Sequence, residues 1–115
     1  MGYGVEVLRE VPWIAPCRQF YWGDCDTHGL AILNRARAHL PEVKSVLMDE
    51  ATLLEHLDLC VDEPIPSTAT ALPFLNAAER DFYQGLLEHR WGQNLRLEQE
   101  RIDWSWAAAE LAIAR

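Results

Sequence analysis

The spacing of hydrophobic residues in the first half of the chain predicts a strand, a helix and a second strand. Residues 17–22 (CRQFYW) form a β-prone run that stops at Gly23, which is typical of a buried strand. Residues 29–40 place apolar side chains at i, i+3, i+4, i+7 and i+11, as in an amphipathic helix, and Pro41 ends the pattern. A second strand-like run follows at 43–48 (VKSVLM). Because such crossovers join parallel strands, this order predicts an α/β fold with a partial parallel sheet and flanking helices.

Weaker signals surround this unit. Residues 4–14 carry apolar side chains on a helical stripe and predict a short helix that ends in a turn. Asp49 is suited to cap a helix over residues 50–57, because aspartate is a preferred N-cap residue. Residues 62–75 contain three prolines and no clear period, so we expect an irregular surface connection there.

Two helices are predicted in the last third of the chain. Asn76 and Glu79 are spaced as an N-cap and N3 pair, which opens a helix that runs to about Arg90, with Gly92 just past its end. A second amphipathic pattern over 102–113 predicts a C-terminal helix that packs on the sheet. Its apolar positions are Ile102, Trp106, Ala109 and Ile113.

Composition narrows the class of protein. The 115 residues are 50% hydrophobic and 24% charged, which fits one small globular domain. The net charge of −8 excludes a small basic domain that binds nucleic acid through its surface potential, but not a site that meets phosphate through metal ions. The acidic excess lies in residues 41–75, where seven acids accompany only Lys44, and a solvated acidic surface is its usual meaning.

The cysteines and the apolar runs bear on the compartment. Cys17, Cys25 and Cys60 are an odd number at wide spacing, so they indicate a reducing compartment rather than a disulfide framework. The chain contains neither the apolar core of a signal peptide nor an apolar run long enough to span a bilayer. We therefore expect a cytoplasmic protein that is not bound to a membrane.

The polar segment at 23–29 (GDCDTHG) carries the candidate chemistry. It lies where a predicted strand ends and a helix begins, which is the edge of an α/β sheet where ligands bind. In extended chain Asp24 and Asp26 point to the same side and Cys25 to the other. Two neighbouring carboxylates repel unless a cation lies between them, and Mg²⁺ prefers such hard oxygen ligands. The pair therefore predicts a magnesium or manganese site.

Other residues of this edge extend the candidate site. Gly23 and Gly29 would let a phosphate backbone approach closely, and the start of the helix would add backbone N–H groups. Asp49, at the end of the next parallel strand, is either a further carboxylate of the metal site or only a helix cap. His28 is a candidate catalytic residue or a hydrogen-bonding residue at the helix start.

Two other kinds of site use some of these residues, and both fit less well. Cys25, His28, His56 and Cys60 have spacings that zinc ligands show, but Cys25 is expected to point away from the aspartate side. A phosphatase of the haloacid dehalogenase class also has Asp-x-Asp after a strand. That class needs threonine two residues beyond the second aspartate, whereas Thr27 is adjacent to it.

Three segments resemble, in order, the family of C-terminal domains of JetD proteins, the nuclease subunits of Wadjet plasmid-defence systems. They are YWGDCDTHGLAILNRARAHLP, the MDEATL segment that begins at Met48, and RLEQERI at 96–102. The resemblance extends from Gly2 to about Trp106 and so covers nearly the whole chain.

The resemblance implies a Toprim-like (Rossmann-like) fold, similar to that of the topoisomerase VI A subunit, and a metal-dependent DNA endonuclease. Toprim domains hold Mg²⁺ with a glutamate on an early strand and an Asp-x-Asp pair. Asp24 and Asp26 match that pair, and His28 and Gly29 match the positions that follow it. The family's partners are closed circular DNA and the subunits of a ring-shaped SMC-type ATPase complex.

The chain departs from the family pattern at the glutamate. That residue is expected on a strand before the Gly-Tyr-Gly segment at 2–4, and Glu6 and Glu10 do not match it. We therefore expect residues 1–115 to be one Toprim-like domain without its N-terminal strand and the family's upstream region. Such a fragment should bind metal weakly and cleave DNA negligibly by itself.

The alternative function is a non-catalytic structural or interaction domain of the same complex. Arg96, Glu98, Glu100 and Arg101 would then form a salt-linked helical surface. Self-association, as in a homodimer, would indicate an exposed apolar patch. Three tryptophans are expected in the core or on such a surface, namely Trp91, Trp104 and Trp106.

Overall fold

The computed structural model describes residues 20–114 and shows a mixed α/β arrangement. The predicted helix at 4–14, Cys17 and the first residues of the predicted strand at 17–22 lie outside the described residues. The elements, in chain order, are β1 (Phe20–Tyr21), α2 (Thr27–His39), β2 (Lys44–Ser45), α3 (Glu50–Glu55), η1 (Leu57–Leu59), β3 (Val61–Asp62), α4 (Ala77–Leu87), β4 (Leu95–Arg96), η2 (Gln99–Arg101) and α5 (Trp104–Ala114).

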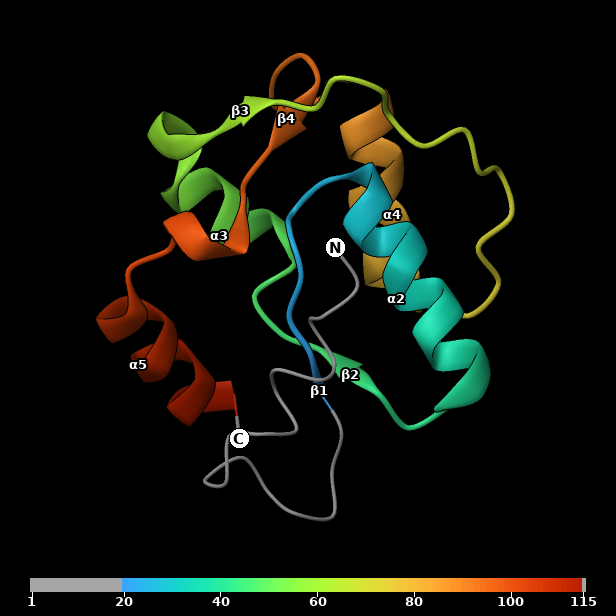
Figure 1. Cartoon of the computed structure of the whole chain (residues 1–115), viewed down its shortest axis with the longest axis horizontal. Helices are drawn as coiled ribbons and strands as arrows, with labels where there is room; N and C mark the ends of the chain where they lie inside the picture. Colours follow the sequence, from blue (N-terminus) through green and yellow to red (C-terminus); the bar gives the residue numbers. More distant parts are fainter. Residues whose placement is uncertain (1–19, 115) are drawn as a thin grey trace.

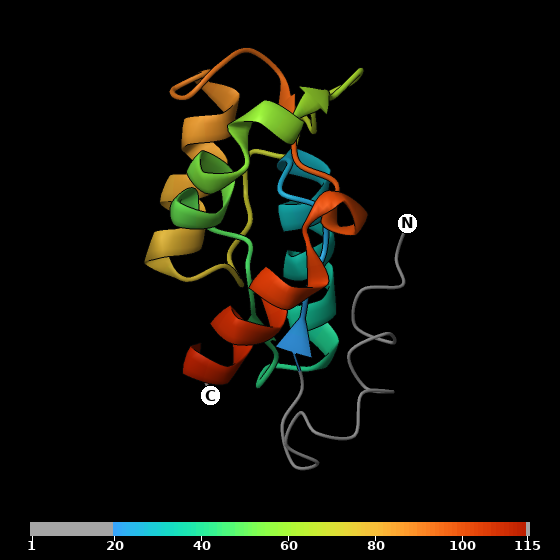
Figure 2. The same cartoon turned by 90° about the vertical axis from the view of Figure 1, so that its left-hand side faces the viewer.

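The helices surround a short parallel ladder. In Figure 1, β1 and β2 lie in the lower part of the molecule, with α2 and α4 to the right and α3 and α5 to the left. The β3–β4 ladder lies at the opposite end of the molecule from β1 and β2, and the view in Figure 2 agrees. None of the helices in the described part of the chain is long and apolar enough to cross a membrane.

The parallel crossover predicted from the sequence is confirmed. β1 pairs with β2 in parallel, with Phe20 opposite Lys44 and Tyr21 opposite Ser45. The pairing continues by one hydrogen bond, 3.0 Å long, from the backbone N–H of Val46 to the carbonyl of Tyr21. Strand β2 is shorter than the predicted 43–48, and Leu47, with a positive φ of 57°, turns the chain out of the ladder after Val46.

Helix α2 begins two residues before the predicted start. Asp26 is its N-cap residue, and the Asp26 side chain accepts a hydrogen bond from the backbone N–H of Gly29. Of the predicted apolar stripe only Gly29 and Leu33 are buried, and Leu30, which lies beside the stripe, is buried as well. The same aspartate that was predicted as a metal ligand therefore also sets where the helix starts.

Helix α4 has the predicted capping box, but it ends earlier than expected. The Asn76 side chain accepts from the backbone N–H of Glu79, and the Glu79 side chain accepts from the backbone N–H of Asn76. The helix ends at Leu87 rather than near Arg90, and His89 follows with a positive φ of 58°. The turn that starts there is too tight for the helix to continue.

The prediction of a charged helical surface at 96–101 is wrong. Leu95–Arg96 is strand β4, which pairs antiparallel with β3, and only Gln99–Arg101 is a single turn of 3₁₀ helix. Of the expected ion pairs in this segment the structure shows one, between Arg101 and Glu98, at 3.7 Å. Long-range pairing with the 61–62 segment determined the local conformation here, which charge spacing could not reveal.

The C-terminal helix exists, but its buried face differs from the predicted stripe. Over residues 104–112, the part of α5 whose burial is described, Ala107 and Leu111 are buried and Ala109 is exposed. Helix α5 is apolar on nearly every side (WSWAAAELAIA), so periodicity alone could not select the buried face. Aromatic contacts attach the region to the rest of the molecule: Trp106 packs edge-on against His56 of the α3 end, with ring centroids 4.6 Å apart.

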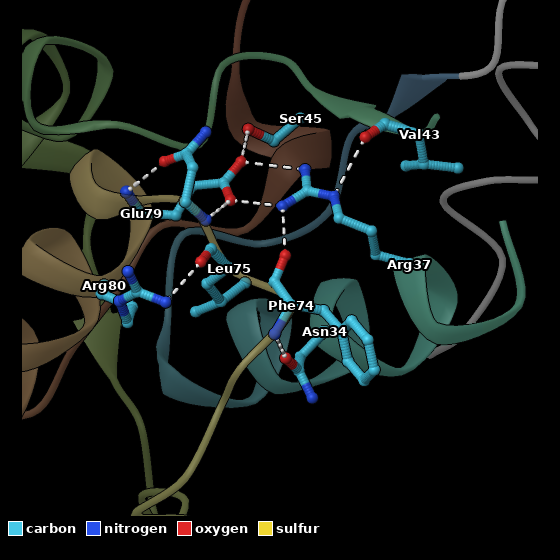
Figure 3. Close-up of polar contacts among 9 residues, drawn as sticks. Asn34, Arg37, Val43, Ser45, Phe74, Leu75, Glu79 and Arg80 are labelled. Atoms are coloured by element: carbon cyan, nitrogen blue, oxygen red, sulfur yellow. Dashed lines mark hydrogen bonds and ion pairs between the residues drawn. The ribbon is translucent and has the colours of Figure 1, made fainter. Parts of the chain in front are cut away.

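A buried ion pair joins α2 to α4 (Figure 3). Arg37 Nη1 lies 2.5 Å from Glu79 Oε1, and the two side chains are 13% and 6% exposed. The hydroxyl of Ser45 donates to Oε2 of the same carboxylate, at 2.6 Å. Burial alone would raise the pKa of Glu79, but the hydrogen bonds from Arg37, Ser45 and the Asn76 backbone outweigh it and lower the pKa. This carboxylate thus links the crossover helix, strand β2 and the start of α4.

Candidate functional site

A cavity of about 340 Å³ lies where β1 ends and α2 begins. The chain reaches it from three places: the loop after β1, the first turn of α2, and the segment that contains β4 and η2. Its lining residues are Tyr21, Gly23, Asp24, Asp26, His28, Gly29, Ile32, Arg96 and Gln99. The structure therefore brings together five of the six candidate residues, since Asp49 does not line this cavity.

Asp24 and Asp26 both line the cavity, and each carboxylate is held in place by one of its oxygens. Oδ1 of Asp24 accepts from the backbone N–H of Gln99 at 2.9 Å, and Oδ1 of Asp26 accepts from the backbone N–H of Gly29 at 2.6 Å. Within residues 20–114, no hydrogen bond engages Oδ2 of either aspartate. One oxygen of each carboxylate thus remains available to a ligand in the cavity.

The expected alternation of side chains about Cys25 is observed. Cys25 is buried, and its thiol donates to the carbonyl of Leu47, at 3.2 Å, in the core. Its backbone pairs in both directions with Leu97, through hydrogen bonds of 2.8 and 3.1 Å. Burial and the surrounding acids raise the pKa of the Cys25 thiol, which therefore stays protonated. Cys25 anchors the loop, and the flanking aspartates point into the cavity.

Burial raises the pKa of Asp26 to about 6. The N–H of Gly29 opposes this rise, the carboxylates of Glu63 and Asp24 add to it, and the charge of Arg96 opposes it. The pKa of the buried Tyr21 hydroxyl is also raised, first by burial and then by Asp24 and Asp26. The acids beside Tyr21 and Asp26 contribute to both rises, and a cation bound near these carboxylates would offset their mutual repulsion.

Gly29 is required by the close approach of the loop to the helix. A Cβ atom on Gly29 would collide with the backbone carbonyl oxygen of Asp24. A Cβ atom on Gly23 would collide with the ring and hydroxyl of Tyr21. Both glycines line the cavity as predicted, and both are already needed for the loop itself.

His28 lies at the rim of the cavity and is exposed. Its Nε2 is 2.5 Å from the carbonyl oxygen of Ile65, so this ring nitrogen donates a hydrogen bond to the 63–76 connection. The contact is the one expected of a hydrogen-bonding residue at a helix start, and a catalytic role remains a prediction.

Asp49 lies outside the cavity and caps α3. Its Oδ1 accepts from the backbone N–H of Thr52 at 2.9 Å, and the side chain lines a different cavity beside α4. Leu47 and Met48 still contact the loop at Cys25 and Gly23, but the Asp49 side chain is bound to the first turn of α3. Of the two roles considered for Asp49, the structure supports the helix cap.

Glu63 is a buried carboxylate next to the site that the sequence did not indicate. It accepts from the Thr27 hydroxyl at 2.8 and 2.9 Å and from the backbone N–H of His28 at 3.2 Å. The Thr27 hydroxyl in turn accepts from the backbone N–H of Ser67 at 2.7 Å. The residue lies in a proline-rich segment with no period, so no local pattern distinguished it from its exposed neighbour Asp62.

We expect Glu63→Ala to lower the free energy of unfolding by about 2 kcal/mol, because two buried donors lose their acceptor. Urea denaturation would measure the change. The matched control is Asp62→Ala, an exposed neighbour that we expect to change stability by less than about 0.5 kcal/mol. Equal effects of the two variants would contradict the role given to Glu63.

Glu63 also changes the expectation for the helix start. The first N–H groups of α2 were expected to face an incoming phosphate. Instead the N–H groups of Thr27 and His28 point at Glu63, and that of Gly29 points at Asp26. The protein's own carboxylates therefore occupy this helix N-terminus.

Arg96 and Gln99 complete the cavity, and the sequence indicated neither of them as a site residue. Both belong to the RLEQERI segment that carried the family resemblance, but charge spacing assigned Arg96 to a helical surface. Strand β4 and the Cys25–Leu97 pairing bring them to the aspartates. Periodicity and charge spacing cannot predict this pairing, because the paired residues are far apart in the chain, so the position of Arg96 and Gln99 beside the aspartates was not predicted.

The donor set suits a hard divalent cation with two protein ligands. Asp24 and Asp26 line one cavity, and each has an oxygen that makes no hydrogen bond within residues 20–114, which suits the hard oxygen ligation of Mg²⁺ and Mn²⁺. Among the described residues, no group of three or more histidine, cysteine or acidic side chains is arranged to hold a metal ion. This finding is against the four-ligand zinc site, whose Cys60 thiol bonds to the His56 carbonyl.

Comparison with known proteins identifies the family. A search of curated proteins finds no match. The family model described as "Wadjet protein JetD, C-terminal" matches residues 1–111. That match covers nearly all of the chain, including the cavity and every residue that lines it. The chain therefore belongs to the family of C-terminal domains of the Wadjet protein JetD.

Proposed function

We propose that this chain is a metal-dependent nuclease domain that cleaves DNA phosphodiester bonds within a Wadjet-type plasmid-defence complex. The observation that carries the proposal is the pair Asp24 and Asp26 on one cavity, each with an oxygen that makes no hydrogen bond within residues 20–114. We further propose that the mixed α/β arrangement is Toprim-like, which the parallel β1–α2–β2 crossover supports.

In this proposal Asp24 and Asp26 hold Mg²⁺ or Mn²⁺ through their Oδ2 atoms. The bound cation would supply positive charge to the phosphate oxygens as negative charge develops during cleavage. Gln99 and Gly29 orient the two carboxylates through their backbone N–H groups. Gly23 and Gly29 keep side chains out of the approach to the pair.

The charge of the chain bears on its partners. A domain of net charge −8 gains little from general attraction to DNA, so affinity for closed circular DNA would come from the metal and from partner subunits. We propose that these partners are the subunits of an SMC-type ATPase complex and that the complex acts in the cytoplasm. A homodimer of the nuclease subunit is compatible with this assembly.

We expect Asp24→Ala to reduce plasmid nicking by at least a hundredfold, because one of two metal ligands is lost. The assay uses supercoiled plasmid and a reconstituted complex whose JetD subunit carries this domain, with Mg²⁺ or Mn²⁺. Asp58→Ala, which removes an exposed acid on η1, is the matched control and should leave nicking unchanged. Unchanged nicking by Asp24→Ala would refute the nuclease site.

An interaction domain without catalysis is the second candidate. Its support is a set of large apolar side chains on the surface, with Ile65 75%, Trp104 52% and Phe74 47% exposed. If the domain acts only in assembly, substitutions at these positions would disrupt the complex and Asp24→Ala would not affect nicking.

A further inference from the structure

We propose that Arg96 binds the substrate phosphate in the Asp24–Asp26 cavity, as the positively charged side of a phosphodiester site. This inference rests on the proposed nuclease function for the identity of the anion. It assigns a role to a residue that charge spacing had placed on an outer helical surface.

The start of helix α2 is already occupied and has no free N–H group for a phosphate among Thr27, His28 and Gly29. The N–H groups of Thr27, His28 and Gly29 are directed at the carboxylates of Glu63 and Asp26. An anion at this end would compete with two carboxylates that are part of the fold. A phosphate in the cavity therefore needs a different donor.

Arg96 is the cationic side chain that lines this cavity. Its position is fixed on both sides: Arg96 pairs with Val61 in the β3–β4 ladder, and the next residue, Leu97, pairs with Cys25 between the two aspartates. The backbone therefore holds Arg96 beside the metal-binding loop, whatever the rotamer of its side chain.

The guanidinium group of Arg96 has unused donors. Its Nε is buried and makes no hydrogen bond to any described residue. No ion pair within 4.0 Å joins it to an acid in the described part of the chain, although its charge acts on the nearby carboxyl group of Asp26. A buried N–H without a partner is costly and uncommon in proteins, and an anion bound in the cavity would supply the acceptor that Arg96 Nε lacks.

The chemistry of the group matches a phosphodiester. Two carboxylates balance one divalent cation, so Arg96 leaves the occupied cavity with one positive charge. A phosphodiester carries one negative charge and two unesterified oxygens, which the planar guanidinium can bind with two parallel hydrogen bonds. The aspartates and the arginine would then contact the same phosphate from two sides, one through the metal and the other directly.

NMR spectroscopy of the 115-residue chain tests this assignment, with dimethyl phosphate as the probe and Mg²⁺ present. We expect the Nε–H signal of Arg96 to shift as dimethyl phosphate is added. In Arg96→Gln the dissociation constant, followed at the backbone signals of Gly23 and Gln99, should rise at least tenfold. Arg101→Gln removes an exposed arginine of the same segment and should change it less than twofold.

Three other results of these titrations would overturn the assignment of Arg96. An unmoved Arg96 Nε–H signal at saturating probe, or an unchanged dissociation constant in Arg96→Gln, overturns the assignment. An equal response to acetate also overturns it, because the cavity would then bind anions without preference for phosphate. The wild-type Nε–H signal decides the question even if Arg96→Gln fails to fold.

The same titration separates this proposal from the nuclease proposal. If Mg²⁺ shifts the signals of Asp24 and Asp26 while dimethyl phosphate leaves Arg96 unmoved, only the role of Arg96 is refuted. If the probe shifts Arg96 while Mg²⁺ leaves the aspartates unmoved, the metal-dependent nuclease is refuted and Arg96 remains a phosphate-binding residue.

Discussion

Asp26→Asn is expected to abolish metal-dependent DNA cleavage and, at the same time, to stabilise the metal-free domain at neutral pH. Asparagine keeps an Oδ1 acceptor for the N–H of Gly29, and it is as good an N-cap residue as aspartate. It removes the charge that burial and the neighbouring acids make unfavourable. A variant that loses activity while its stability rises is expected where a carboxylate serves to bind a cation and destabilises the fold without it.

The sign of the pH dependence follows from the raised pKa. Asp26 has a pKa of about 6 in the folded chain, against 3.8 for the unperturbed group. As the pH rises from about 4 to about 6, the unfolded chain loses the Asp26 proton while the folded chain keeps it, so stability falls. At pH 7 the ionised Asp26 costs about 3 kcal/mol of folding free energy, and this cost is absent from Asp26→Asn.

Calorimetry at pH 5 and pH 8, without divalent metal, measures this difference. The melting temperature of Asp26→Asn should exceed that of the wild type by more at pH 8 than at pH 5. Mg²⁺ should raise the wild-type value and leave the variant unchanged. Asp58→Asn, an exposed control, should behave as the wild type at both pH values. A variant that is less stable than the wild type at pH 8 would contradict the environment assigned to Asp26.

Glu79→Ala is expected to be the most destabilising substitution, with a loss of about 3–5 kcal/mol. It leaves the charge of Arg37 buried without its carboxylate, and the hydroxyl of Ser45 and the N–H of Asn76 lose their acceptor (Figure 3). A domain of this size has a total stability of about 5–15 kcal/mol, so the variant should be close to unfolding. Urea denaturation measures the change.

The matched control lies on the same helix. Asp81 pairs with Arg90 at 3.0 Å, but its side chain is 66% exposed. Asp81→Ala should therefore change stability by less than about 1 kcal/mol. The lowered pKa of Glu79 adds a second signature: its contribution is present at neutral pH and is lost as the pH falls below about 4.5. A loss from Glu79→Ala no larger than that from Asp81→Ala would show that this ion pair does not hold α2 to α4.

Local patterns predicted the parts of the fold that local chemistry determines. The crossover, helix α2 and the capping box of α4 followed from periodicity, turn residues and the Asn76–Glu79 spacing. The side on which Asp24 and Asp26 lie, opposite Cys25, followed from the alternation of extended chain. These features need only residues that are close together in the sequence.

The predictions that were wrong concern structure that depends on contacts between residues far apart in the sequence. β3 and β4 pair across more than thirty positions, and the segment around Leu97 joins the loop at Cys25 across the length of the domain. No local period predicts such pairings, so Arg96 was misplaced and Glu63 was missed. The buried face of α5 failed for a different reason, because a uniformly apolar helix has no preferred side.

The most direct test of the metal site is paramagnetic line broadening by Mn²⁺, measured on the backbone amide signals of the 115-residue chain. Substoichiometric Mn²⁺ should first broaden the signals of residues 23–29 and of Arg96 and Gln99, which surround the cavity. Excess Mg²⁺ should restore these signals. Broadening that starts elsewhere, or that persists at residues 23–29 in the double variant Asp24→Asn/Asp26→Asn, would contradict a metal site formed by these two aspartates.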